Sequence, residues 1–302
     1  MINYSFIIPH KNSPELLSRC IDSIPQRSDI EIIVVDDNSS ADKLPTIDRT
    51  GAFLTKLGEK ESKGAGHARN VGLSQAKGDW LLFADCDDFY EEGFLDILDN
   101  SKDDELDILY FRYYNNDGIN KTTDTVWTDL MYDQYVHSPK SKKDIMHLGL
   151  ATTNPWNKMF SHKYILEIGC RFEEIPMGND AWFVNYAGFN ARKVKVINDR
   201  LYDYIQIPSG ITLSKRPLSH HMTLIDSDKK RNKLKIKAKC YDLLLLQGFN
   251  KEVIVRDYGR KTYYLLFIKR AFTDLGFFIA IVRAILRKLH IINDYGLKNG
   301  KS

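Results

Sequence analysis

Short apolar runs separated by amphipathic segments mark the first part of the chain. Residues 4–9, 31–35 and 80–84 are almost wholly apolar, as is typical of strands that are buried on both faces of a parallel sheet. Residues 14–24 instead place apolar side chains at helical spacing, and residues 65–76 are a further helix candidate. This alternation of strands and helices predicts an α/β fold with a largely parallel sheet.

Acidic residues follow two of the expected strands. Asp36-Asp37 comes directly after residues 31–35, and Asp85-Cys86-Asp87-Asp88 comes directly after residues 80–84. Open parallel sheets bind ligands outside the carboxyl ends of their strands. The two acidic segments therefore predict a single cleft.

The rest of the chain is less regular. Residues 108–114 form an aromatic, strand-like piece among probable helices, and the final section reads as helical. Residues 233–239 alternate with period two, but we favour a helix because the sequence DLLLL follows so closely. We divide the chain into three parts: residues 1–104, 105–215 and 216–302.

Composition and charge narrow the function classes. The 302 residues can bury a full core, and the 43% apolar and 27% charged content excludes wholesale disorder, collagen and coiled coil. Residues 215–302 hold 20 Lys and Arg against 7 Asp and Glu, a net +13, whereas residues 1–214 carry −10. A basic extension on an acidic body indicates an anionic partner, either a membrane surface or a nucleic acid.

Cysteine usage and the N-terminus point to a reducing compartment. The four cysteines are scattered and form no CxxC pair, so neither a disulfide framework nor a zinc site is indicated. The apolar run that ends at Pro9 is too short for a signal peptide. We therefore expect a cytoplasmic protein.

The second acidic segment is a candidate metal site. Asp85, Asp87 and Asp88 place three carboxylates within four residues, and their mutual repulsion is offset most simply by a divalent cation. Oxygen ligands without nearby His or Cys favour Mg²⁺ or Mn²⁺, ions that commonly neutralise a diphosphate. The alternative is an ordinary acidic turn that caps a helix near residues 91–98.

A glycine-containing segment, residues 63–70, is a candidate diphosphate environment. It combines close backbone approach, an expected helix N-terminus and cations, including Arg69. It is not the GxGxxG fingerprint, because Arg69 stands where the third glycine would be needed, and GxxxxGK[ST] is absent from the chain. Nicotinamide-dinucleotide and P-loop interpretations are therefore excluded.

The order of the motifs is more informative than any one of them. FIIPHKN, VVDDNSS, GAGHARNVGL, AKGDWLLFADCDD and GNDAWF follow one another along residues 4–215. This series resembles the family 2 glycosyltransferases of GT-A fold, a Rossmann-like domain with a mostly parallel central sheet and helices on both faces. The resemblance implies a nucleotide-diphosphate-sugar donor, a divalent cation and inversion at the anomeric carbon. It assigns donor binding to residues 1–104 and acceptor binding to residues 105–215.

The resemblance also implies roles for single residues. Asp180 would be the general base, and Asp87 and Asp88 would hold the metal. Nucleotide-sugar contacts would come from six residues, of which Asp85 and Asp87 form the DxD motif: Pro9, Lys11, Asp37, Arg69, Asp85 and Asp87.

The sequence departs from the family pattern at two of these places. Asn179 replaces the usual Glu before the base, and Lys11 stands where a base-stacking Tyr is common. Trp156, Asn157 and Lys158, together with Asn179, resemble the acceptor side of capsule and lipopolysaccharide transferases. The alternative for the first three is a core tryptophan followed by a polar turn.

Residues 275–292 are expected to form a helical extension. Arg283, Arg287 and Lys288 interrupt its apolar run, so we do not expect it to span a membrane. Its apolar side chains share one helical face, which predicts an interfacial helix on an anionic leaflet. Packing on the body or on another subunit is the alternative. The face consists of Leu275, Phe278, Ile279, Val282, Ile285, Leu286 and Leu289.

These observations predict a metal-dependent, inverting glycosyltransferase on the inner face of the cell membrane. We expect a UDP-sugar donor, and a bacterial surface glycan or a lipid-linked acceptor. One alternative, a sugar-phosphate nucleotidyltransferase, should carry a loop rich in Gly and Arg or Lys after its first strand, which FIIPHKNSPE lacks. The other alternative is a non-catalytic scaffold whose basic tail binds a partner. Few aromatic residues interleave residues 229–239, which argues against nucleic acid.

Overall fold

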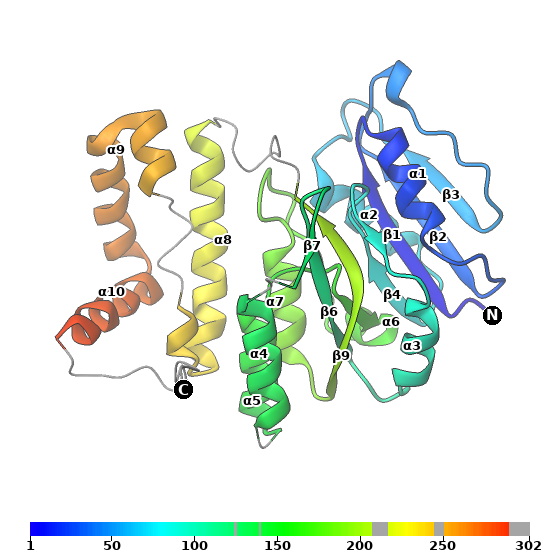
Figure 1. The fold of residues 1–302 in the computed structure, drawn as a ribbon. Helices are drawn as coiled ribbons and strands as arrows, with labels where there is room; N and C mark the ends of the chain where they lie inside the picture. The colour runs from blue at the N-terminus through cyan, green and yellow to red at the C-terminus, as the bar shows by residue number, and fades with distance from the viewer. Residues whose placement is uncertain (124–125, 139, 207–216, 245–250, 290–302) are drawn as a thin grey trace. The chain divides into compact units, whose positions relative to one another are not determined.

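The computed structural model describes residues 1–123, 126–138, 140–206, 217–244 and 251–289 (Figure 1). The chain divides into two compact units, Met1–Leu213 and Ser214–Ser302. The expected further division at residue 104 stays a prediction.

Four parallel strands begin the sheet of the first unit. They are β1 (Tyr4–His10), β2 (Ile30–Asp36), β3 (Ala52–Lys56) and β4 (Trp80–Phe83), in the order β3-β2-β1-β4. Three of these strands are the ones that the apolar runs predicted. β3 was not predicted, because its residues are only partly buried or exposed and form no apolar run.

The sheet continues through an antiparallel strand. β8 (Lys158–Ser161) pairs antiparallel with both β4 and β6 (Ile108–Asn116), and β6 pairs parallel with β9 (Val194–Ile205). The short strands β5 (Phe89–Tyr90) and β7 (Lys121–Thr122) pair antiparallel with β9 and β6. The nine described strands therefore form one mixed sheet in which two parallel groups flank β8.

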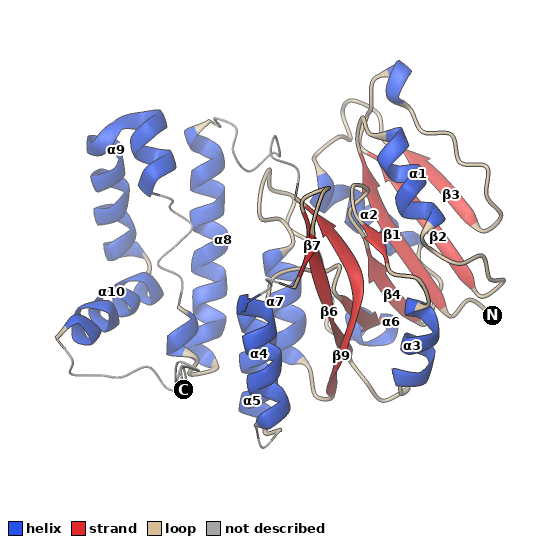
Figure 2. Ribbon diagram, viewed as in Figure 1, coloured by secondary structure: helices blue, strands red, loops and turns tan. Residues whose placement is uncertain are grey.

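Helices cover both faces of this sheet (Figure 2). Along β1, Phe6 and Ile8 join a core that includes residues of α1 and α3, whereas Ile7 points the other way and joins the core on the opposite face. The first face is covered by α1 (Pro14–Asp22) and α3 (Phe94–Ser101). The opposite face is covered by α2 (Ala65–Gln75), α4 (Val126–His137), α5 (Lys142–Ala151), α6 (His162–Glu167) and α7 (Ala181–Asn190).

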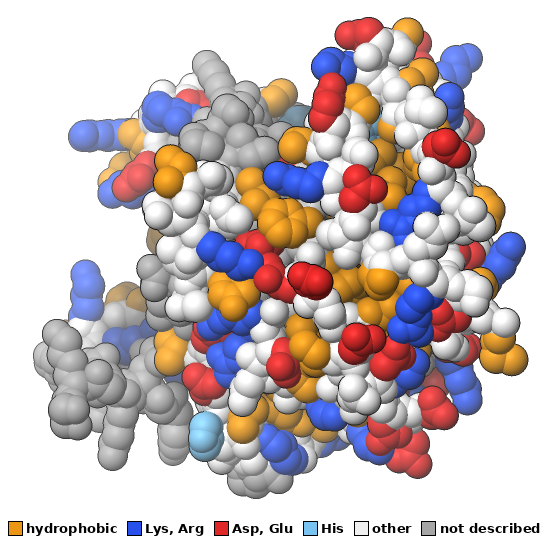
Figure 3. Space-filling model, turned by 45° about the vertical axis from the view of Figure 1, so that its right-hand side comes forward, with side chains coloured by type: hydrophobic (Ala, Val, Ile, Leu, Met, Phe, Trp, Pro, Cys, Tyr) orange, Lys and Arg blue, Asp and Glu red, His pale blue; other side chains and the backbone are white. Residues whose placement is uncertain are grey.

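Charges of both signs lie on the surface of the first unit. On the face turned to the viewer in Figure 3, Asp and Glu side chains lie interspersed with Lys and Arg side chains. The first unit also has exposed ion pairs, such as those of Lys193 with Asp103 and Glu105. The net negative charge of this unit is therefore not gathered into one acidic patch on that face.

The second unit is helical, as the sequence analysis predicted. Its helices are α8 (Leu218–Lys237), α9 (Lys251–Thr273) and α10 (Leu275–Lys288), with a short 3₁₀ turn at Tyr241–Leu243. The period-two segment that begins at residue 233 continues α8. Gly259, with φ of 83°, breaks the regular helix inside α9.

Buried ion pairs hold the three helices of the second unit together. Arg270 of α9 binds Asp228 of α8 and Asp274, which precedes α10, at 3.3 Å each. Asp228 also pairs with Arg231, and Asn232 donates to Asp274. Buried charges are tolerated when they are paired in this way.

The helix α10 presents apolar side chains in two directions. Phe277 and Ala280 are buried, whereas Phe278 is 51% exposed and Ile285 is 52% exposed. Residues 290–292 of the predicted helix lie outside the described residues. No helix in the described parts of the chain is long and apolar enough to cross a bilayer.

Candidate active site

The carboxyl ends of β1, β2 and β4 lie at one edge of the sheet. Because these strands are adjacent and parallel, the residues that follow them are brought together, and Asp37 and Asp85 both come from these loops. The sheet register thus brings the two acidic segments to a single edge, as their positions after two strands predicted. We call Asp37, Arg69, Asp85, Asp87 and Asp180 the strand-end site.

A buried pair at the ends of β1 and β2 supports this edge. His10 and Asp36 are register partners, and their side chains meet with Nδ1 2.7 Å from Oδ1. The Ser13 amide donates to Nε2, so Nδ1 is the ring nitrogen that donates to Asp36. Burial acts to raise the pKa of Asp36, but hydrogen bonds from Ser39 and His10 outweigh it and hold that pKa below its usual value. This pair was not predicted, although each of its residues directly follows an apolar run in the sequence.

Asp37 fixes the loop that leads into α2. Its Oδ1 accepts hydrogen bonds from the backbone amides of Lys63 and Gly64, at 3.1 and 3.2 Å. Lys11 lies 3.4 Å from Oδ2, and its side chain is half exposed. Pro9 is buried in β1. Two of the residues expected around the nucleotide base, Lys11 and Asp37, thus meet, and Lys11 is the one that reaches solvent.

Arg69 of α2 is buried at the centre of the strand-end site. Its Nη2 lies 2.5 Å from Asp85 Oδ1, its Nη1 donates to Asn179 Oδ1 at 2.7 Å, and its guanidinium lies 5.5 Å from the ring centre of Phe172. Burial acts to lower the pKa of Arg69, but the charges of Asp85 and Asp180 outweigh it and raise that pKa. A permanently charged group therefore joins the acidic loop to the residue before the expected base.

Gly66 allows the first turn of α2 to approach the segment that precedes α7. A Cβ at this position would lie 2.1 Å from the backbone oxygen of Glu173 and 2.9 Å from Cβ of Asn179. No side chain fits there without movement of the backbone. The glycine of the GAGHARN motif is thus explained by this close contact.

The three carboxylates after β4 differ in their surroundings. Asp88 is 1% exposed, and its two oxygens accept from the Tyr202 hydroxyl at 2.9 Å and the Ile205 amide at 2.7 Å. Burial and the charges of Asp85 and Asp87 raise its pKa well above the usual range. Asp88 thus ties this loop to β9, and it is the carboxylate least available to a metal. It does not cap α3, whose N-cap is Gly93.

Asp85 and Asp87 are the two carboxylates that remain accessible. The Asp85 side chain is 32% exposed, and burial together with the charge of Asp85 raises the pKa of Asp87. Among the described residues, no three His, Cys, Asp or Glu side chains converge on one point. Two carboxylates fit Mg²⁺ or Mn²⁺ when diphosphate oxygens complete the shell. Asp85 and Asp87 are therefore the two carboxylates of this loop that could hold such a metal.

Asn179 and Asp180 lie just before α7. Arg69 contacts Asn179 through one guanidinium nitrogen and Asp85 through another. Asp180 occupies the N-cap position of α7, but its side chain does not cap the helix. Gly178, with φ of 65°, turns the chain before them. The Asp180 residue is partly exposed. Its negative charge acts to raise the pKa of Arg69 and of Lys158.

The segment expected on the acceptor side is buried. Trp156 stacks on Tyr202 and Tyr204, with ring centres 4.9 and 5.3 Å apart. Asn157 and Lys158 are fully buried. The burial favours the alternative of a core tryptophan followed by polar residues, and these three side chains cannot touch an acceptor without movement of the chain.

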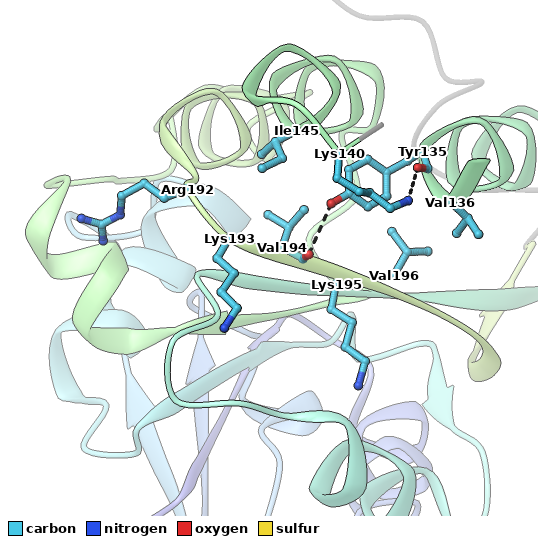
Figure 4. A pocket seen from close by; sticks show the side chains of 9 residues that line it. All are labelled: Tyr135, Val136, Lys140, Ile145, Arg192, Lys193, Val194, Lys195 and Val196. Carbon is cyan, nitrogen blue, oxygen red and sulfur yellow. Dashed lines mark hydrogen bonds between the residues drawn. The ribbon is translucent and has the colours of Figure 1, made fainter. Parts of the chain in front are cut away.

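A separate cavity of about 450 Å³ lies between the α4–α5 pair and the start of β9 (Figure 4). Val194 and Val196 point into it, whereas Lys193 and Lys195 point to the other side of the strand. Two strands, β8 and β6, separate β9 from β4 in the sheet. This cavity is therefore distinct from the strand-end site.

Comparisons with known proteins place the chain in a family. The model of glycosyl transferase family 2 matches residues 5–169. The chain is 25% identical over 223 residues to the uncharacterized glycosyltransferase EpsJ of Bacillus subtilis, a match that covers 69% of this chain and 62% of EpsJ. The chain thus spans less than two thirds of the length of that relative.

Two further likenesses extend along the whole chain. The glycosyltransferase GlyG of Streptococcus pneumoniae is 24% identical over 322 aligned positions, which cover 99% of this chain and 98% of GlyG. The crystal structure of S. aureus TarS 1–349 in complex with UDP-GlcNAc has a TM-score of 0.62 at 16% identity and covers 99% of this chain and 95% of that one. The family model covers more than half of the residues, so the chain belongs to glycosyl transferase family 2 and has the GT-A fold.

Proposed function

We propose that this chain transfers a sugar from a nucleotide-diphosphate sugar to a hydroxyl group, with inversion at the anomeric carbon. The observation that carries the proposal is the position of Arg69 between Asp85 and Asn179. One guanidinium joins the DxD motif to the residue beside Asp180. The groups needed for the leaving diphosphate and for the base thus belong to one cluster.

The proposed donor is a UDP-sugar. The likeness to TarS, which is seen in complex with UDP-GlcNAc, supports a uridine nucleotide. Asp37 and Lys11 would lie beside the base, and Pro9 would support their loop. Because Lys11 replaces a stacking ring with a cation, its contact with the base would be polar.

Mn²⁺ or Mg²⁺ is the proposed cofactor, held by Asp85 and Asp87 together with the donor. When bound, the metal would neutralise negative charge on the diphosphate. The raised pKa of Asp87 is consistent with a carboxylate pair that a cation stabilises. Asp88, expected as a metal ligand, is left with a structural role in this proposal.

The chain's own residues would then carry the transfer. Asp180 would accept the proton of the acceptor hydroxyl while the acceptor oxygen attacks the anomeric carbon on the face opposite the diphosphate. The bond from that carbon to the diphosphate oxygen breaks, and the electron pair leaves with the diphosphate. Arg69 would stabilise the negative charge that develops there.

The second unit is the proposed attachment to an anionic membrane, which suits a surface-glycan or lipid-linked acceptor. The exposed face of α10 includes Leu275 and Leu289, at 65% and 61% exposure, beside the cationic positions 283, 287 and 288. Burial of apolar area and attraction to anionic lipid would add together at such a helix. The proposed location is the cytoplasmic face of the cell membrane.

A screen of nucleotide sugars tests the proposal. We expect one UDP-sugar to bind in the presence of Mn²⁺ and to be hydrolysed slowly without an acceptor. Release of pyrophosphate from a nucleoside triphosphate and a sugar phosphate would instead indicate a nucleotidyltransferase. If the protein bound no nucleotide sugar, and if cells kept its biological function when Asp87 and Asp180 were replaced, a non-catalytic scaffold would be indicated.

A further inference from the structure

Lys158 is a buried cation at the end of the sheet where the strand-end site lies. It is the first residue of β8 and is 0% exposed. Its neighbour Met159 pairs with Leu82, so Lys158 lies at the level where β4 ends and the loop to Asp85 begins. The proposed chemistry has not yet given this lysine a role.

The amine of Lys158 has hydrogen-bond acceptors but no ion pair. Nζ donates to the backbone oxygen of Asn154 and to Asn157 Oδ1, the latter at 2.8 Å, and lies 5.3 Å from the ring centre of Tyr110. Within the described ranges, no carboxylate lies at ion-pair distance from it. A buried ammonium with neutral partners alone is costly, so its charge depends on more distant groups.

Packing between β8 and α7 puts Asp180 on the same side of the sheet as this amine. Lys158 and Phe160 are two positions apart on a strand and therefore point to the same face of the sheet. Phe160 contacts Phe183 of α7, with ring centres 5.4 Å apart. Asp180 precedes Phe183 by three positions, one helical turn closer to the edge where Lys158 lies.

We propose that Lys158 is a positioning residue for the base: its buried ammonium group stabilises the ionised form of the Asp180 carboxylate, which must be ionised to accept the acceptor's proton. The inference rests on the proposed role of Asp180 as the base. It also accounts for a buried lysine that cannot reach an acceptor.

Among the described residues, the charged and titratable groups around Lys158 and Asp180 come from α7, β6, α4 and α2. Asp180, at the N-cap of α7, acts on the charge of Lys158, and the Tyr110 ring of β6 lies beside Nζ. Tyr132 of α4 accepts a hydrogen bond from Asn157, and Arg69 of α2 also interacts electrostatically with Asp180. Burial lowers the pKa of Lys158 to about 7, and the charge of Asp180 acts to raise it. Coupling between two sites is reciprocal, so Lys158 must act on Asp180 as strongly as Asp180 acts on Lys158.

Titration of the lysine amines by NMR, in protein labelled at the lysine side chains, tests the coupling without a measurement of activity. We expect the Lys158 signal to titrate near neutral pH, and to move to lower pH in Asp180→Asn. Lys235 of α8 is the matched control, because it is also buried, with a pKa of about 7 that burial lowers, and lies in the other unit. Its titration should not change in Asp180→Asn.

The pH dependence of turnover gives the second readout. In Lys158→Met, the acidic limb of the profile should move to higher pH, by about one unit for loss of a nearby opposite charge, while donor affinity is kept. Lys235→Met should leave the limb in place. If Lys158→Met fails to fold, the NMR titration of the unmodified lysine in Asp180→Asn decides.

Two results would separate this inference from the proposed function. An unchanged Lys158 titration in Asp180→Asn would overturn the inference and leave the transferase proposal intact. Normal turnover in Asp180→Asn would remove Asp180 as the base, and with it the positioning role of Lys158. An unshifted acidic limb in a folded, active Lys158→Met would also overturn the inference.

Discussion

Arg69 and Asn179 lie 110 positions apart in the chain and are joined by a hydrogen bond of 2.7 Å from the guanidinium to the side-chain oxygen. The family pattern used in the sequence analysis would place a glutamate at the position of Asn179. An amide oxygen accepts the same hydrogen bond but does not neutralise the cation. Beside Asn179, the positive charge of Arg69 is therefore neutralised less than it would be beside a second carboxylate. Its attraction for Asp85, and for the diphosphate of the proposed donor, is correspondingly stronger.

Loss of the accessible DxD carboxylate should remove metal-dependent donor binding. Asp87→Ala takes away one of the two carboxylates that can reach a cation, so donor affinity measured by calorimetry with Mn²⁺ should fall severely. Asp96→Ala, on the exposed surface of α3, is the control. Donor affinity that is unchanged by a chelator in the unmodified protein would remove the metal from the proposal.

Replacement of the base should separate chemistry from binding. Asp180→Asn keeps the size of the side chain but removes its basicity, so turnover should fall by about 10²-fold or more at nearly constant donor affinity. Initial rates and calorimetry on the same sample measure both quantities. A variant that binds donor tenfold more weakly would instead place Asp180 in donor binding.

The close approach at Gly66 should not tolerate a side chain. Gly66→Ala would place a methyl group 2.1 Å from the Glu173 backbone oxygen, so the segment that carries Asn179 must move. We expect lower thermal stability and weaker donor binding, because that movement disturbs the Arg69 bridge. Gly58→Ala is the matched control, since its nearest contact would be an ordinary 3.5 Å. Equal behaviour of the two variants would show that the first turn of α2 can shift freely.

Stability should depend on pH through Lys158. Burial lowers its pKa to about 7, below the 10.5 of an ordinary lysine. Between these values the unfolded chain holds a proton that the folded chain has lost, so the free energy of unfolding rises with pH, by at most about 1.4 kcal/mol per unit. Urea denaturation near pH 7 and pH 9 should show a smaller rise in Lys158→Met. Lys235 adds a similar slope, so the rise should be smallest when both lysines are replaced.

The exposed face of α10 should control vesicle binding. Phe278→Glu and Ile285→Glu add charge on exposed positions without removing core contacts, so co-sedimentation with anionic vesicles should be lost. Leu166→Glu, on the exposed surface of α6, should bind as the unmodified protein does. Raised salt should also weaken binding, because lipid attraction is screened. If the unmodified protein does not bind anionic vesicles at all, the exposed face of α10 would instead be a contact surface for protein.

The sequence predicted the parts of the fold that local pattern controls. The strands β1, β2 and β4 are buried on both faces and read as continuous apolar runs, and the carboxylates after β2 and β4 had to meet once those strands were parallel neighbours. The insertion of β8 between β4 and β6 could not be predicted, because it depends on pairing between residues far apart in the chain.

The same limit applies to the site. Asp85 and Asp88 are alike in sequence, but only the position of Tyr202 and Ile205, more than a hundred positions later, shows that Asp88 faces inward. The burial of Lys158 likewise follows from the strands on either side of it. Motif order gave the candidate residues, and long-range packing separated those that can meet a ligand from those that hold the loops.

The antiparallel strand β8 has a consequence for how the protein is made. The strands β1 to β4 are complete when Phe83 has been synthesised, but β4 keeps an open edge until Lys158–Ser161 leaves the ribosome. Unpaired strand edges promote aggregation. A fragment of residues 1–104 would retain that edge, so this segment is not expected to behave as an exchangeable module in recombination or in engineered chimeras.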